Sequence, residues 1–137
     1  MKYLIMLHAT QRGHDMMAGR PNPDPERNLT PEQVQDLHGF MEEYHQRLSE
    51  SGELVEARGL TEPSHARRVT LRKKEGATVV TDGPYAETEE VLAGYTIVEC
   101  ASFDRATEIA ADLLHSGFEG EYVDVRPISG GIEATEV

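Results

Sequence analysis

Residues 81–90 read Thr-Asp-Gly-Pro-Tyr-Ala-Glu-Thr-Glu-Glu and hold the side chains best suited to chemistry. The Asp-Gly-Pro step is a strong turn signal. Such a turn exposes backbone N–H groups, and the Asp82 carboxylate either accepts them or faces a ligand. The same residues therefore predict one of two things: a structural Asx turn, or a site in which Asp82 takes part in proton transfer.

Acid–base work by Asp82 needs a histidine partner. A carboxylate orients an imidazole and raises its basicity, and the histidine then moves a proton near neutral pH. His8 closes the first apolar run, residues 2–8, which we expect in the sheet interior within reach of Asp82. We predict Asp82 and His8 as catalytic residues. We predict substrate contacts from Gly83, Pro84, Tyr85, Glu87, Tyr44 and His14.

A second arrangement of histidines lies on the helix expected after residue 30. His38 and His45 are seven apart with Glu42 between them, so all three project from one flank. That spacing suits a metal ion. Their position beside an apolar stripe favours half-buried helix-flank residues instead. We therefore expect no metal and no cofactor.

Residues 9–30 differ in character from the apolar run before them. Several glycines and prolines predict a long loop, and loops of this length are often functional. Basic side chains on it could supply charge to an anionic substrate and close over it, although a solvated loop explains them as well. These side chains are Arg12, Arg20 and Arg27.

The helix that follows has a clear beginning and end. Thr30-Pro31-Glu32-Gln33 predicts a capping box, with Thr30 as N-cap and Gln33 at N3. Gly52 ends the helix about five turns later. Apolar residues recur between them at spacings of three and four, which predicts one buried stripe: Val34, Leu37, Met41, Tyr44 and Leu48.

The remaining elements complete an α+β pattern. We predict strands at 53–60, 94–100 and 121–127, a hairpin from 67–73 and 77–81, and a helix capped by Ser102. The order is β-α-β, hairpin, β-α-β, which is a ferredoxin-like βαββαβ pattern with an inserted β-hairpin. Two helices cover only one face of that sheet. We therefore predict a homodimer packed sheet to sheet.

The signature segment resembles that of a known family. Asp-Gly-Pro-Tyr-Ala-Glu-Thr-Glu-Glu is similar to the Asp-Gly-Pro-Phe-Ala-Glu-Thr-Lys-Glu motif of the DGPF-type YCII-related proteins. The opening Met-Lys-Tyr-Leu-Ile-Met-Leu and the closing Val-Asp-Val-Arg-Pro-Ile resemble the ends of that family. This chain differs from the motif at Tyr85 and Glu89, and neither change removes the turn.

The resemblance implies a ferredoxin-like fold of the dimeric α/β barrel type. It also implies a His–Asp dyad in a cleft, and one relative is a dehydrochlorinase. Asp82 matches the carboxylate of that dyad, whereas Met41 stands where the histidine is expected. The function we expect is small-molecule acid–base chemistry, as a lyase or hydrolase. The alternative is a non-catalytic metabolite-binding or regulatory dimer.

Composition limits the remaining choices. The chain has 137 residues and a formal net charge of −12, which disfavours nucleic acid and anionic membranes as partners. The single cysteine, Cys100, allows no intrachain disulfide. We expect one cytoplasmic domain over residues 1–137 with a flexible tail at 129–137. We expect a small-molecule ligand.

Overall fold

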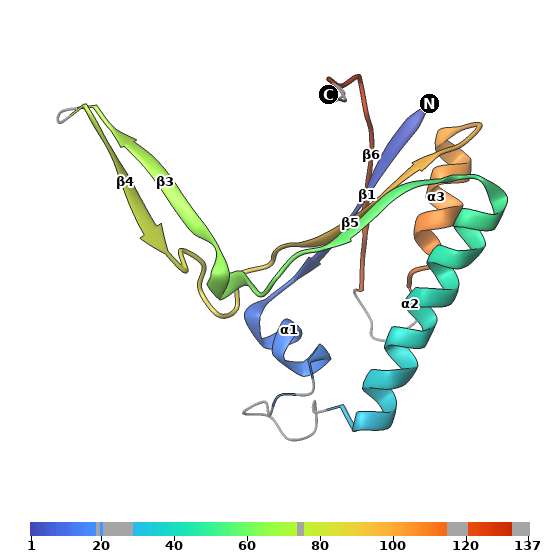
Figure 1. Cartoon of the computed structure of the whole chain (residues 1–137), viewed down its shortest axis with the longest axis horizontal. Coiled ribbons are helices and arrows are strands. Elements are labelled where there is room, and N and C mark those ends of the chain that lie inside the picture. The colour runs from blue at the N-terminus through green and yellow to red at the C-terminus, as the bar shows by residue number, and fades with distance from the viewer. Residues whose placement is uncertain (19, 21–28, 74–75, 115–120, 133–137) are drawn as a thin grey trace, which may run out of the picture. The chain divides into compact units, whose positions relative to one another are not determined.

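The computed structural model describes residues 1–18, 20, 29–73, 76–114 and 121–132, in a mixed α+β arrangement (Figure 1). The elements follow in chain order: β1 (Lys2–Ala9), α1 (Gln11–Met17), α2 (Pro31–Ser51), β2 (Leu54–Gly59), the 3-10 turn η2 (Pro63–His65), β3 (Arg67–Arg72), β4 (Ala77–Asp82), β5 (Val91–Glu99), α3 (Phe103–Ala111) and β6 (Asp124–Pro127).

The strands form two separate sheets. Four of them pair in the order β2-β5-β1-β6, and β3 pairs with β4 in a two-stranded ribbon. β1 and β6 are antiparallel, with Tyr3 opposite Pro127 and Ile5 opposite Val125. The four-stranded sheet is open, with β2 and β6 at its edges, and the described residues close no barrel.

The chain divides into two compact units. The first unit comprises Met1–Leu7, Met41–Arg58 and Gly94–Val137. The second comprises His8–Phe40 and Gly59–Ala93. The first unit therefore contains most of the four-stranded sheet, and the second contains α1, η2 and the hairpin.

The capping box at the start of α2 is confirmed. The Thr30 hydroxyl accepts the Gln33 N–H at 3.1 Å, and the Gln33 side chain accepts the Thr30 N–H at 2.9 Å. Gly52 ends the helix with φ of 80°, a backbone conformation that glycine adopts without strain. The second half of the predicted stripe is also confirmed, since Tyr44 and Leu48 are buried and Met41 packs against them, whereas Val34 and Leu37 are only half-buried.

The core of the first unit lies between the sheet and the helices, with α2 and α3 side by side on one face (Figure 1). The Tyr44 hydroxyl donates to the Ile109 carbonyl at 2.8 Å and ties the two helices together. Ser102 caps α3 as predicted, since its hydroxyl accepts the Arg105 N–H at 3.1 Å. The buried set comprises Tyr3, Ile5, Tyr44, Leu48, Val98, Ala106, Ile109, Ala110 and Leu113.

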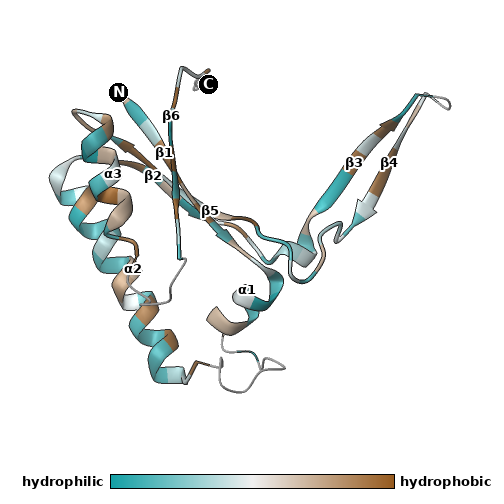
Figure 2. Ribbon diagram, turned by 180° about the vertical axis from the view of Figure 1, so that it is seen from behind, coloured by the Kyte–Doolittle hydropathy of each residue, from teal (hydrophilic) through white to brown (hydrophobic). Residues whose placement is uncertain are grey.

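The described residues of the hairpin in the second unit are mostly exposed. β3 and β4 pair in register from Arg67 opposite Asp82 to Arg72 opposite Ala77. Both strands carry hydrophobic stretches (Figure 2), yet Val69, Leu71 and Val80 are largely exposed. Its predicted position is confirmed, and backbone pairing is what defines it.

Several predicted boundaries differ from the structure. The loop expected over 9–30 contains a helix, α1, because the Thr10 hydroxyl caps the Gly13 N–H at 2.9 Å. β5 begins three residues earlier than predicted, at Val91, and β6 begins at Asp124. Residues 21–28, 115–120 and 133–137 lie outside the described residues, so the loop residue Arg27 and the end of the tail go undescribed.

Candidate functional site

The signature turn begins where β4 ends, in the second unit. Gly83 follows Asp82 with φ of 55°, in the left-handed region that favours glycine. Its N–H donates to the Ala66 carbonyl at 2.8 Å and so ties the turn to the segment after η2. A Cβ on Gly83 would lie 3.5 Å from the Ser64 carbonyl oxygen, in ordinary contact. Backbone conformation, more than space, therefore selects glycine here.

Three different arginines contact the signature turn. Arg67 Nε lies 3.2 Å from Asp82 Oδ1, across the first register pair of the hairpin. The Arg68 guanidinium lies over the Tyr85 ring, 5.5 Å from its centroid. Arg12 of α1 lies 3.7 Å from Glu87. All these charges are largely exposed, and the Asp82 side chain is 82% exposed.

The second half of the signature closes on itself. The Ala86 N–H donates to the Glu89 carboxylate at 3.3 Å, and the Glu89 N–H donates to the Ala86 carbonyl at 3.0 Å. The Glu89 side chain therefore stabilises this turn by accepting the Ala86 N–H.

A polar cluster joins α1 to the segment around η2. Arg20 Nη2 lies 2.7 Å from Glu62 Oε2, 3.1 Å from Asp15 Oδ1 and 3.1 Å from His14 Nδ1. The Arg20 hydrogen bond is the main cause that lowers the pKa of Glu62 to about 2, with the Ser64 hydroxyl contributing next. The same hydrogen bond raises the pKa of Arg20.

A second layer of hydrogen bonds holds these carboxylates. The Gln11 side chain donates to Asp15 at 3.0 Å and accepts the Ser64 N–H at 2.9 Å. The Ser64 hydroxyl donates to Glu62 at 2.8 Å. Sequence reasoning singled out His14 and Arg20 but missed Glu62 and Ser64. The run Glu62-Pro63-Ser64-His65 puts a carboxylate, a hydroxyl and an imidazole in one turn, which is the signal that could have found them.

Two of the predicted site residues have a defined setting elsewhere. His8 is the next-to-last residue of β1 and is half-buried, and its pairing with Asp82 stays a prediction. Tyr44 is buried in the first unit, where its hydroxyl bonds to Ile109 and burial raises its pKa. A substrate contact by Tyr44 likewise stays a prediction.

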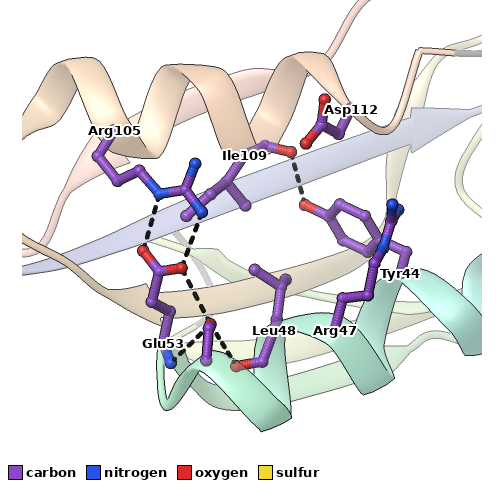
Figure 3. A pocket seen from close by; sticks show the side chains of 8 residues that line it. Tyr44, Arg47, Leu48, Glu53, Arg105, Ile109 and Asp112 are labelled. Atoms are coloured by element: carbon purple, nitrogen blue, oxygen red, sulfur yellow. Dashed lines mark hydrogen bonds and ion pairs between the residues drawn. The ribbon is translucent and has the colours of Figure 1, made fainter.

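The first unit has a small cavity of about 130 Å³ between α2 and α3 (Figure 3). Arg105 grips Glu53 there with two hydrogen bonds of 2.9 Å, which lower the pKa of Glu53. That pairing uses both oxygens of the carboxylate and both nitrogens of one guanidinium edge. The cavity is lined by Tyr44, Arg47, Leu48, Ser51, Glu53, Arg105, Ile109 and Asp112.

The two histidines of α2 have different settings. His45 Nε2 lies 3.3 Å from the Thr96 hydroxyl on β5, and burial is the main cause that lowers its pKa. His38 and Glu42 are exposed. A half-buried helix-flank histidine describes His45 well, as the alternative to a metal ligand.

Fold and site together define a small mixed α+β protein with a polar, arginine-rich turn beside a short helix. The model of the YCII-related domain family matches residues 1–126, so the chain belongs to that family and the predicted family is confirmed. It is also similar to an uncharacterised protein of Rhizobium meliloti (strain 1021), with 43% identity over 60 residues. That match covers 44% of this chain and 48% of the relative, so it spans about half the length of the relative. Within the described residues no helix is both long and apolar enough to cross a membrane.

Proposed function

We propose that the second unit binds a small anionic metabolite at the signature turn and acts on it by proton transfer. The observation that carries the proposal is that Asp82, Tyr85 and Glu87 are each approached by a different arginine. This gathering of basic side chains occurs in a chain whose formal net charge is −12. Guanidinium groups present paired N–H donors that suit carboxylate and phosphate groups. Basic side chains gathered at one place in an acidic chain would give an anion a preferred binding site.

The arginines at the turn would be available to a ligand. Exposed ion pairs contribute little to folding, because water screens the attraction and holding two long side chains is entropically unfavourable. An incoming anion would exchange with the Asp82 and Glu87 carboxylates at little loss. The aromatic ring of Tyr85 and the backbone of Gly83 and Pro84 would then line the ligand, with His14 of α1 as a further contact.

The chemistry that we propose uses Asp82 with His8. A carboxylate that orients the imidazole would let His8 move a proton to or from the bound molecule. Elimination, isomerisation and hydrolysis all need such a step. The second candidate is a non-catalytic binding or regulatory module. The high exposure of Asp82 favours it, because water weakens the electrostatic effects on which an acid–base site depends.

A thermal-shift screen of carboxylates against their neutral amides tests the binding. We expect carboxylates to raise the Tm of the wild type and the amides to leave it unchanged. Arg68→Gln should abolish the shift, while Arg72→Gln, at the far end of the same strand, should keep it. Equal shifts from acid and amide, or an unaltered response in Arg68→Gln, would overturn the anion proposal.

Asp82→Asn then separates the enzyme from the binding module. A carboxylate that stabilises both wild type and Asp82→Asn would be incubated with each protein and followed by NMR. Conversion by the wild type alone would support catalysis. Binding by both proteins with conversion by neither would establish the module instead.

We also propose the ferredoxin-like arrangement and the homodimer. The strand order β2-β5-β1-β6 supports the first, with α2 between β1 and β2 and α3 between β5 and β6. For the dimer, Thr96 and Val98 are buried, so alternation puts Ile97 on the opposite face of the sheet, and Val55 on edge strand β2 is exposed. Two such faces would close a dimeric barrel. A monomer mass by light scattering at micromolar concentration would contradict the dimer.

A further inference from the structure

We propose that His14, Asp15 and Glu62 form a binding site for a divalent transition metal, and that the guanidinium of Arg20 occupies this site in the metal-free protein. One ligand atom from each of the three residues lies within 4.8 Å of the other two. Imidazole nitrogen and carboxylate oxygen are donors that zinc and its neighbours accept. Among the residues that the structure describes, no other trio of His, Cys, Asp or Glu comes together in this way.

Arg20 marks where the ion would sit. A single nitrogen, Nη2, lies 2.7 Å from Glu62, 3.1 Å from Asp15 and 3.1 Å from His14. Three potential ligand atoms thus converge on one positively charged atom. Zinc binds such donors at about 2.0–2.2 Å, so the three side chains would draw in by roughly 0.5–1 Å once the guanidinium leaves.

The contact between Arg20 and His14 also indicates how the imidazole nitrogen would meet a metal ion. A guanidinium nitrogen has hydrogens to donate and no lone pair with which to accept. His14 Nδ1 therefore accepts, and its lone pair points toward the centre of the cluster. A lone pair aimed at that position is what a metal ion needs from a histidine.

Hydrogen bonds from neighbouring side chains already orient the two carboxylates. Gln11 donates to Asp15, and the Ser64 hydroxyl donates to Glu62. Outer hydrogen bonds of this kind hold metal ligands in place and tune the site. Gln11 also accepts the Ser64 N–H, so both supports belong to one network across α1 and η2.

Charge explains why the two occupants would exchange. Two carboxylates beside one guanidinium leave the cluster with a formal charge of −1, whereas a divalent ion would neutralise it. The Arg20 side chain is nearly half exposed, so it can swing into water, where a cation is well solvated. Metal and Arg20 therefore compete for one position, and removing the arginine should tighten metal binding.

This site goes beyond the proposed anion binding and does not depend on it. The two share only His14, and the arginines that meet the signature turn, Arg12, Arg67 and Arg68, take no part in the metal site. Zinc titration of Arg68→Gln should match that of the wild type whether or not that variant has lost its response to carboxylates.

Isothermal titration of the full chain with Zn²⁺, after treatment with chelator, tests the proposal. We expect Arg20→Gln to bind one zinc ion about tenfold or more tighter than the wild type, because the competing occupant is gone. Arg58→Gln, which alters an exposed arginine of the first unit, should leave the wild-type affinity unchanged. Adding His14→Ala to Arg20→Gln should abolish the gain, while adding His38→Ala should not.

Co²⁺ absorption provides a second readout for the same variants. We expect Arg20→Gln to give visible bands of a nitrogen- and oxygen-ligated ion, and Arg20→Gln with His14→Ala to lose them. Circular dichroism shows whether each variant is folded, and Arg20→Ala, which also removes the competing cation, replaces Arg20→Gln if that variant is not. Equal zinc affinity in wild type and Arg20→Gln, or a gain that survives His14→Ala, would overturn the proposal.

Discussion

Each unit of this protein contains an arginine that grips a shielded glutamate, and the two pairs differ in what they leave unfinished. Glu53 in the first unit and Glu62 in the second are 17% and 18% exposed. Arg105 meets both oxygens of Glu53 through two nitrogens at 2.9 Å. Arg20 instead shares one nitrogen among Glu62, Asp15 and His14.

The difference teaches which pair is structural and which can exchange. Arg105 projects from α3, whose other face is buried in the core. Its Nε and Nη2 donate to the two oxygens of Glu53, and its Nη1 donates to Glu108 at 3.2 Å. Within the described part of the chain, each of these three nitrogens has a single carboxylate oxygen as its partner. Nη2 of Arg20 has two hydrogens to donate and three acceptors around it. Few of the described side chains in the second unit are buried. A cluster with more acceptors than the guanidinium can satisfy is the one in which a divalent metal ion can replace the arginine.

The largest effect should come from the core that supports the first pair. Ile109 is 1% exposed and Val69 on the hairpin is 64% exposed. We expect Ile109→Ala to lower the free energy of unfolding by about 2–5 kcal/mol, since it opens a cavity in a packed core. Val69→Ala should change it by less than about 0.5 kcal/mol. Urea denaturation measures both, and similar losses would show that the hairpin side chain is buried in solution, as by a partner.

An intermediate effect should follow from the backbone of the signature turn. Gly83→Ala places a Cβ at φ of 55°, and we expect a loss of about 1 kcal/mol in stability. The matched control is Gly39→Ala on the exposed side of α2, where no atom lies within 4 Å of the new Cβ. That change should stabilise the helix by about 0.5–1 kcal/mol. Opposite signs for two identical substitutions would tie the first loss to conformation, and equal signs would not.

The elements that sequence predicted best are those whose signals are local. The capping box at Thr30 and Gln33 and the cap at Ser102 each rest on side chains three residues from the N–H they accept. The stripe from Val34 to Leu48 depends on helical periodicity alone. Such signals need no knowledge of the rest of the chain.

The polar cluster was beyond the same reasoning because its partners are far apart in sequence. Arg20 and Glu62 are separated by 42 residues, and Gln11 and Ser64 by 53. Helix α1 was missed because Gly13 and the nearby prolines predict a loop, whereas the Thr10 cap and the bond from Gln11 to Asp15 favour a helical turn. The signature turn was placed correctly, but no pattern indicated that its residues would face arginines.

The smallest effect, and the most direct comparison of the two pairs, is their dependence on pH. The ordinary pKa of a glutamate is 4.5, and the folded protein lowers it to about 2 for Glu62 and lowers it for Glu53 as well. A carboxyl whose pKa is depressed by folding stabilises the folded state above its unfolded pKa. That contribution is lost as the pH falls from about 4.5 toward 2.

We therefore expect the wild-type urea midpoint, measured with chelator present, to fall between pH 5 and pH 2.5. Arg20→Gln should flatten this fall, because Glu62 loses the partner that most depresses its pKa. Arg105→Gln should flatten it as well, because Glu53 loses the guanidinium that is the main cause of its lowered pKa. If Arg20→Gln and the wild type lose stability in parallel across this window, Arg20 does not hold Glu62 in solution. The contact between Arg20 and Glu62, on which the difference between the two units depends, would then be absent in solution.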